Sequence, residues 1–144
     1  MATLSTVVMR FEAKAALAIG ILLPVLETYR RGFGHWRVEF SSMFEDYLAG
    51  ALLLAGAWAA YRRHSSHGAI LLAGWAWVTG MMTISFADQV EVTIRGVDLE
   101  PMNTDVLVVK FLLLAISAAA LLRSFRFVSA RVTRDSSAGL ELEP

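Results

Sequence analysis

The chain has 144 residues, no cysteine, and a formal net charge of zero from 13 basic and 13 acidic side chains. The lack of cysteine excludes disulfides, thiolate metal sites and cysteine nucleophiles, and the scattered basic residues argue against a nucleic-acid partner. With 56% apolar residues and a positive mean hydropathy, the chain is expected to form one compact unit. Eleven of the basic residues are arginine, a bias that indicates a GC-rich bacterial gene.

Four apolar segments of transmembrane length follow one another along the chain, at about 11–29, 44–63, 69–88 and 104–124. A helix rises about 1.5 Å per residue, so residues 44–61 would extend about 27 Å, close to the roughly 30 Å of a bilayer's hydrocarbon core. We therefore expect an all-α membrane protein in which residues 1–127 form four transmembrane helices in an antiparallel bundle.

The first two helices differ in how they begin. The first follows basic residues and has its apolar centre over 15–26, a pattern that also fits a cleaved signal peptide. Because residues 26–29 offer no small-residue cleavage pattern, we favour a retained helix with Pro24 near its end. The second helix opens with Ser42 and Glu45, whose spacing predicts a capping box in which each side chain accepts a hydrogen bond from the other's backbone N–H.

Two polar segments fall outside these helices. Residues 90–95 alternate apolar and polar side chains, which is strand-like periodicity, and Gly96 could turn the chain back into residues 97–100. Arg-Gly is a poor hairpin dipeptide, so a small ribbon over 90–100 is left as an open alternative. Residues 128–144 are polar and acidic at their end, and we expect them to be disordered.

The distribution of lysine and arginine predicts the orientation in the membrane. Eight basic residues would lie on the side of the termini and the second loop: Arg10, Lys14, Arg62, Arg63, Arg123, Arg126, Arg131 and Arg134. Four would lie on the opposite side: Arg30, Arg31, Arg37 and Arg95. Because cytoplasmic loops carry the excess of positive charge, both termini are predicted to be cytoplasmic in a multi-pass protein of the bacterial inner membrane.

Four ionisable side chains within or just inside the helices form the candidate cluster: Glu27, Asp46, Asp88 and Lys110. All four fall in the outer half of the predicted bundle, and ionisable residues inside a membrane mark functional sites by default. Each shares a helix face with small residues, which let membrane helices approach closely. The faces are Glu27 with Pro24, Gly20 and Ala16; Asp46 with Ala49, Gly50, Leu53, Ala57 and Ala60; Asp88 with Ser85, Ile84, Met81, Gly80, Trp77 and Gly74; and Lys110 with Leu113, Ser117, Ala120 and Ser124.

Lys110 is the deepest of the four and needs a partner from another helix. Asp105, five residues earlier, lies about 140° around the helix at roughly 100° per residue, so Asp46 or Asp88 is the predicted counter-ion. The alternative is a structural role, in which Asp46 favours a helix N-terminus, Glu27 and Asp88 are hydrated interfacial groups, and Lys110 extends its stem to the interface. Because all four groups sit near an interface, we favour a structural ion-pair cluster over a working site.

No metal or cofactor site is predicted. His64 and His67 have i,i+3 spacing but lie in a turn flanked by arginines, which favours a solvated turn over a metal site. The predicted helices contain no histidine that could hold a membrane haem. The sequence also has no phosphate loop, nucleophile elbow or zinc-protease motif.

Three functions fit these observations. The favoured one is a small membrane protein that acts by interaction, as an accessory protein, a subunit or a homo-oligomer, with the lipid bilayer and other membrane helices as partners. The second is an oligomeric proton- or ion-coupled transporter of small molecules that uses Lys110 with Asp46 or Asp88. The third is a lipid- or quinone-modifying enzyme with Asp46, Asp88 or His35 as acid or base, and it ranks last because nothing else in the sequence completes such a site.

Overall fold

Four α-helices make up the regular secondary structure of the described residues. The computed structural model describes residues 2–32, 40–95 and 104–140, with side chains described for 11–29, 32, 40–41, 43–95 and 107–133. The helices are α1 (Ala2–Arg31), α2 (Phe40–Tyr61), α3 (His67–Arg95) and α4 (Thr104–Leu140). The prediction of an all-helical chain with four helices is confirmed.

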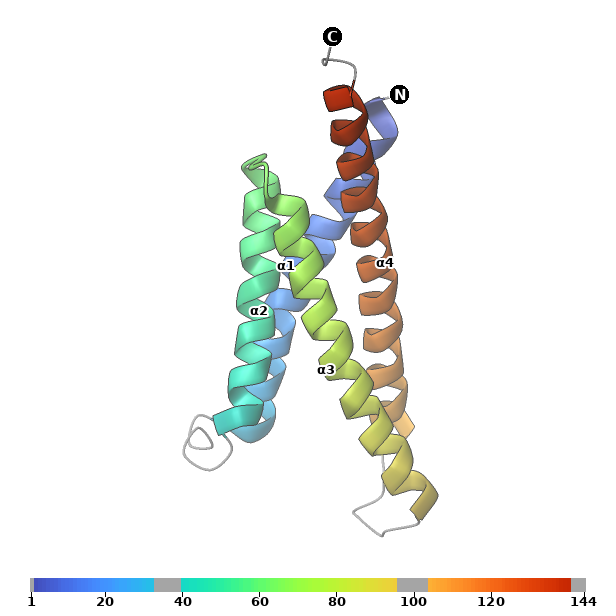
Figure 1. Ribbon diagram of the computed structural model, residues 1–144. Coiled ribbons are helices and arrows are strands. Elements are labelled where there is room, and N and C mark those ends of the chain that lie inside the picture. Colours follow the sequence, from blue (N-terminus) through green and yellow to red (C-terminus); the bar gives the residue numbers. More distant parts are fainter. Residues whose placement is uncertain (1, 33–39, 96–103, 141–144) are drawn as a thin grey trace.

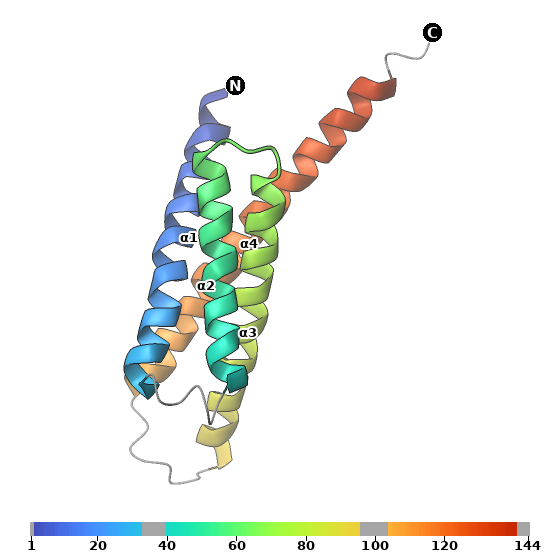
Figure 2. The ribbon, with the colours of Figure 1, turned by 90° about the vertical axis from the view of Figure 1, so that its left-hand side faces the viewer.

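Consecutive helices run antiparallel and pack in chain order, α1 on α2, α2 on α3 and α3 on α4 (Figure 1). The start of α1, the α2–α3 turn and the end of α4 therefore lie at one end of the molecule, which we call the turn end. The end of α1, the start of α2, the end of α3 and the start of α4 lie at the other end, which we call the loop end. The C-terminal part of α4 extends beyond its neighbours, away from α1 (Figure 2).

α3 is longer than predicted, because residues 90–95 continue the helix instead of forming a strand. The Oγ1 of Thr93 donates to the carbonyl of Gln89 at 2.7 Å, and Glu91 forms an i,i+4 ion pair with Arg95. Extending an existing helix needs no new nucleation, whereas an isolated two-stranded ribbon is marginal in water. Local helical contacts therefore outweigh the alternating pattern at 90–95, and residues 96–103 lie outside the described residues.

α1 and α4 also exceed their predicted bounds. α1 begins at Ala2 instead of near residue 11, and α4 continues to Leu140, through most of the segment expected to be disordered. No proline or glycine interrupts α4 before Gly139, and each residue added to a helix gains one backbone hydrogen bond. The polar composition of 128–140 is therefore compatible with a helix that has already been nucleated in an apolar segment. Residues 141–144 lie outside the described residues.

α2 begins at Phe40, so Ser42 lies in the first turn of the helix and not at its N-cap. The side chain of Ser42 is outside the described residues, and its capping hydrogen bonds with Glu45 stay a prediction. The rings of Phe40 and Phe44 stack one turn apart at this end, with centroids 5.7 Å apart.

Small residues let the helix backbones approach closely in the core. A Cβ on Gly50 would lie 2.6 Å from the carbonyl oxygen of Gly20 and 2.7 Å from the Cγ of Pro24, between α1 and α2. Between α2 and α3, a Cβ on Gly56 would lie 2.9 Å from the Cδ2 of Leu71. Close approach at small residues is typical of helix packing in membranes. The buried core consists of Ala16, Ile19, Leu23, Ala49, Leu53, Ala57, Leu71, Trp75, Val78, Met82 and Ala120.

Many large apolar side chains point outward from the helices. Exposed examples occur on every helix, including Phe11, Ile21, Val25 and Leu26 on α1, Phe44 and Trp58 on α2, Trp77 and Ile84 on α3, and Val109, Phe111, Leu112, Leu122 and Phe125 on α4. Two segments, α3 and residues 107–133 of α4, are long and apolar enough to cross a membrane by length and composition.

Candidate functional site

Two of the four predicted cluster residues lie at the loop end of the α1–α2 interface. Glu27 is only 8% exposed, and Asp46 is half-buried. Beside them, the Oγ1 of Thr28 donates to the carbonyl of Pro24 at 2.7 Å and lies 2.7 Å from the hydroxyl of Tyr47. Because the threonine hydroxyl has one proton, it accepts the hydrogen bond from Tyr47. This bond ties α1 to α2 and holds both acids at one interface.

Lys110 lies between α3 and α4 and is held by α3. Its Nζ donates to the carbonyl of Ser85 at 3.3 Å and to the Oε1 of Gln89 at 2.9 Å. The predicted partners of the lysine were the carboxylates Asp46 and Asp88. These two hydrogen bonds go instead to a neutral carbonyl and a neutral amide one turn apart on α3.

The buried face of α3 is rotated from the predicted one. It consists of Gly68, Leu71, Gly74, Trp75, Val78 and Met82. Asp88 is exposed, Ile84 is 66% exposed, and a Cβ on Gly80 would meet nothing within 4 Å. The prediction assigned the buried face from the position of Asp88. The helical spacing of the residues that are actually buried continues instead to Ser85 and Gln89. The structure therefore does not bring Asp88 into the helix interior with Glu27.

The faces predicted on the other three helices are confirmed. Six small or polar residues on these faces are at most 3% exposed: Ala16 on α1, Ala49 and Ala57 on α2, and Ser117, Ala120 and Ser124 on α4. Ala60 on the α2 face is half-buried. Sequence reasoning succeeded on these helices because the small residues continue through the centre, where neighbouring backbones approach most closely.

Glu12 is the most deeply buried charged residue of the part of the chain that the structure describes, and it was not among the predicted site residues. It is 1% exposed, and its Oε1 accepts a hydrogen bond from the Nε of Arg123 at 3.3 Å. The guanidinium of Arg123 also lies over the ring of Phe11, 5.4 Å from its centroid. This ion pair joins the first helix to the last. The available signal was the spacing of Glu12, one turn before Ala16 on the small-residue face of α1.

Three buried polar atoms of the described residues have no hydrogen-bond partner: Trp75 Nε1, Thr79 Oγ1 and Ser124 Oγ. The Oγ of Ser117 donates to the carbonyl of Leu114 in its own helix at 2.9 Å. The interior of α3 and α4 thus carries donors and acceptors in an otherwise apolar core. These groups can hold neighbouring helices in register, but they are neither acids nor bases near neutral pH.

The two histidines of the α2–α3 turn bond to the turn itself. The Nδ1 of His64 lies 2.8 Å from the Oγ of Ser66, and the Nδ1 of His67 forms a hydrogen bond with the carbonyl of His64. Among residues with described side chains, no group of three or more His, Cys, Asp or Glu residues is placed to hold a metal ion.

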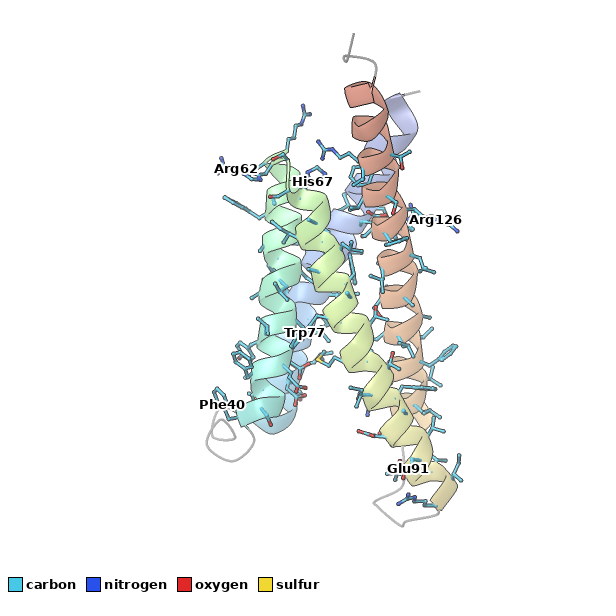
Figure 3. The ribbon with its side chains drawn as sticks, in the orientation of Figure 1. Phe40, Arg62, His67, Trp77, Glu91 and Arg126 are labelled. Carbon is cyan, nitrogen blue, oxygen red and sulfur yellow. The ribbon has the colours of Figure 1, made fainter. Side chains whose placement is uncertain are left out.

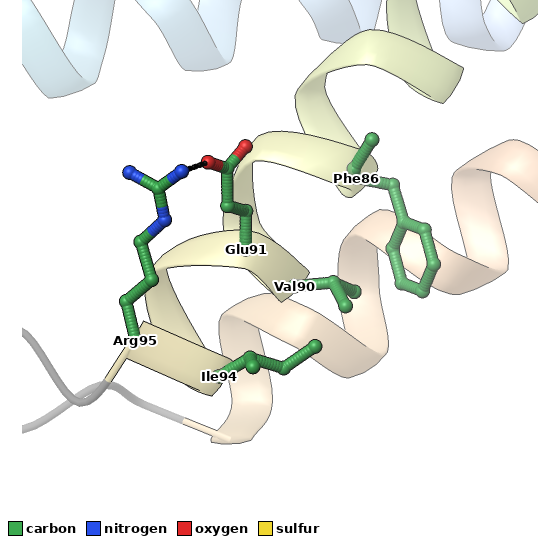
Figure 4. A pocket seen from close by; sticks show the side chains of 6 residues that line it. Phe86, Val90, Glu91, Ile94 and Arg95 are labelled. Atoms are coloured by element: carbon green, nitrogen blue, oxygen red, sulfur yellow. Dashed lines mark ion pairs between the residues drawn. The ribbon is translucent and has the colours of Figure 1, made fainter.

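A shallow depression of about 400 Å³ lies on the surface at the loop end of α3 (Figure 4). Its lining is mostly apolar and comes from one helix: Phe86, Ala87, Val90, Glu91, Ile94 and Arg95. The ion pair between Glu91 and Arg95 crosses its polar side, and each of these side chains is more than half exposed. The depression brings together no acid and base on separate elements.

Comparison with protein-family models, with curated proteins and with solved structures finds no match. The fold therefore defines only a broad class: the described residues form an all-helical protein of four helices, with two candidate membrane spans. Anything more specific is inferred from the residues described above.

Proposed function

We propose that this chain is a multi-pass membrane protein whose four helices all cross the bilayer and that it acts by assembling with other membrane helices. The observation that carries the proposal is the distribution of side-chain size. Large apolar residues point outward on every helix, while alanine and glycine fill the contacts between helices. In water, such a surface would be an aggregation hazard. In lipid it is the expected exterior, because helices there associate through close packing of small residues.

Helix length supports the same proposal. α1 has 30 residues and α4 has 37, so at about 1.5 Å per residue they extend about 45 Å and 55 Å, more than a roughly 30 Å hydrocarbon core. On α1, residues 15–26, between Lys14 and Glu27, carry no charge, and on α2 no charged residue follows Asp46 up to the end of the helix at Tyr61. A central apolar stretch is left on both helices.

The distribution of basic residues supports a cytoplasmic turn end in a bacterial inner membrane. Arg62 and Arg126, labelled in Figure 3, lie at the turn end, as does Arg131, which bonds to Ser65 in the α2–α3 turn. Positive charge accumulates on the cytoplasmic side of membrane proteins. At the loop end, Arg95 is paired with Glu91, and Lys110 is hydrogen-bonded to α3.

An assembly role is favoured because the interior of the single chain is filled. Trp75, Met43, Leu53, Leu71 and Val78 are at most 2% exposed, and the α2–α3 connection is a turn held by its own hydrogen bonds. A chain built this way offers its outer faces to a partner. The partner is another copy of the chain or a second membrane protein.

Native mass spectrometry of protein extracted gently from its own membrane tests this proposal. We expect a homo-oligomer or a stoichiometric complex with a different membrane protein. A monomer that carries lipid alone, across several mild detergents, would contradict the assembly role. Gly80→Leu is a useful companion variant, because Gly80 is exposed and its Cβ meets nothing in the single chain. A change in oligomeric state caused by Gly80→Leu would therefore report on assembly rather than on folding.

Lys110 favours one alternative function, an ion- or proton-coupled transporter. A lysine inside a candidate span, hydrogen-bonded to a neighbouring helix, is the kind of intramembrane charge that ion pathways use. Lys110→Gln removes the charge but keeps an amide donor for Ser85 and Gln89. Flux in reconstituted vesicles that falls with Lys110→Gln but not with the exposed Lys14→Gln would support transport. Absence of any flux in the unaltered protein would leave assembly as the role.

A further inference from the structure

Two segments that are far apart in sequence meet at the turn end. The Nη1 of Arg131 on α4 donates to the carbonyl of Ser65 in the α2–α3 turn at 3.1 Å. The ring of His67 packs on that of Phe127, with centroids 5.9 Å apart. The relative placement of the turn and the second half of α4 is thus fixed by direct contacts.

These two segments gather five arginines, which we call the basic collar: Arg62, Arg63, Arg123, Arg126 and Arg131. All five are exposed, and Figure 3 labels Arg62 and Arg126 on the two sides of this end. Arg63, two residues after the end of α2, has a left-handed backbone with a φ of 56°. The chain therefore turns away from the axis of α2 at Arg63.

Carboxylates are unevenly distributed between the two ends. Among the residues with described side chains, Glu12 is the acid at the turn end, and it neutralises Arg123. The other described acids belong to the loop-end parts of their helices: Glu27, Glu45, Asp46, Asp88 and Glu91. Among the described residues, the collar therefore carries four arginines in addition to the one paired with Glu12, and this excess of positive charge favours binding of an anion.

Aromatic residues place the collar at the depth of lipid headgroups. Trp58 and Tyr61, in the last turns of α2, are 63% and 57% exposed, and such rings prefer the membrane–water interface. The guanidinium of Arg62 lies 5.4 Å from the centroid of the Trp58 ring. On α4, the exposed Phe125 directly precedes Arg126. Exposed aromatic side chains thus lie next to arginines of the basic collar on both α2 and α4, as expected of a surface that binds a lipid.

We propose that the basic collar binds the headgroup phosphates of anionic phospholipids in the leaflet that it faces. This inference rests on the proposed membrane embedding and names one class of partner for it. Guanidinium groups bind phosphate through two parallel hydrogen bonds. Each arginine near an anionic membrane surface contributes about fivefold to binding at moderate ionic strength. A nucleic acid would bind the same charges, but the adjoining exposed aromatic residues would add nothing to its affinity.

The test compares lipid retention in nanodiscs of equimolar phosphatidylcholine and phosphatidylglycerol, read by native mass spectrometry after mild release. The test variant is Arg62→Gln/Arg63→Gln/Arg126→Gln, which leaves the contact of Arg131 with Ser65 intact. The matched control is Arg95→Gln, an exposed arginine at the loop end. A conservative variant with lysine at the same three collar positions keeps the charge.

We expect the unaltered protein, the control and the lysine variant to retain phosphatidylglycerol preferentially. In the glutamine variant, the ratio of retained phosphatidylglycerol to retained phosphatidylcholine should fall about a hundredfold, because three arginines contribute about fivefold each. Equal retention of both lipids by correctly inserted, unaltered protein would overturn the proposal, as would an unchanged preference in the glutamine variant. Loss of phosphatidylglycerol on adding millimolar inorganic phosphate at constant ionic strength would assign the collar to free phosphate instead.

Failure of the membrane proposal has a different signature. Protein that stays outside the nanodiscs, in all four forms, would refute membrane embedding and not the collar alone. Protein that inserts but shows no lipid preference would refute the collar while leaving the embedding intact.

Discussion

Replacing Gly50 by alanine should weaken the contact between α1 and α2. The new Cβ would lie 2.6 Å from the carbonyl oxygen of Gly20 and 2.7 Å from the Cγ of Pro24, and the first of these contacts is with backbone that cannot rotate away. Overpacking of this kind costs about 1–3 kcal/mol. Alanine also gains up to about 1 kcal/mol of helix propensity over glycine, so the single variant alone understates the steric cost.

Gly80→Ala supplies the matched control. Gly80 is also in a helix, but a Cβ there meets nothing within 4 Å. The difference between the two variants removes the propensity contribution and should be about 1–3 kcal/mol in the free energy of unfolding. Reversible denaturation in mixed micelles, followed by circular dichroism, measures both values. Equal stability of Gly50→Ala and Gly80→Ala would show that the α1–α2 backbones are not in close contact at this level.

Three further predictions concern the charged groups and the end of α3. Arg123→Ala leaves the buried carboxylate of Glu12 without its partner and should lower the free energy of unfolding by about 1–3 kcal/mol, less than for a fully buried pair because Arg123 is half exposed. Glu12→Leu/Arg123→Leu should recover most of that loss in the same denaturation assay, and a double variant as unstable as Arg123→Ala would argue against the pair. Lys110→Leu removes both hydrogen bonds to α3 and should be about 1–2 kcal/mol less stable than Lys110→Gln; equal unfolding curves would mean that these bonds contribute nothing. Spin labels placed singly at positions 90–95 should show solvent accessibility that repeats every 3.6 residues or so, whereas a repeat of two in the electron paramagnetic resonance data would restore the ribbon.

Helix content was readable from the sequence because apolar runs and small-residue spacing are local patterns. The face of α2 from Ala49 to Ala57 and that of α4 from Ser117 to Ser124 could be assigned in this way. The α3 face could not, because its orientation is set by packing against other helices: Trp75 is fully buried, whereas Trp77, two residues later, is 43% exposed. Because the predicted α3 face was assigned from the charged residue Asp88, the wrong face was predicted to be buried.

The charged contacts were harder to predict than the helices. Asp46 or Asp88 was the predicted partner of Lys110, whereas the hydrogen bonds from Lys110 to α3 go to the Ser85 carbonyl and the Gln89 amide. The Glu12–Arg123 pair joins residues 111 positions apart, and no local pattern connects the first helix to the last. Helix ends were also misplaced at 90–95 and 128–140, because propagation of an existing helix outweighs a weak local preference for strand or disorder.

Crossing of the bilayer by all four helices is tested most directly by cysteine accessibility, since the chain has no cysteine of its own. Four single variants report on the two ends of the molecule: Tyr29→Cys and Ile94→Cys at the loop end, and Ser65→Cys and Thr133→Cys at the turn end. All four positions are exposed. In intact bacterial cells, a membrane-impermeant maleimide should label Tyr29→Cys and Ile94→Cys, and it should reach Ser65→Cys and Thr133→Cys only after the membrane is permeabilised. Equal labelling of all four in the soluble fraction of broken cells would contradict the membrane assignment, and labelling of Ser65→Cys together with Ile94→Cys in intact cells would show that α3 does not cross.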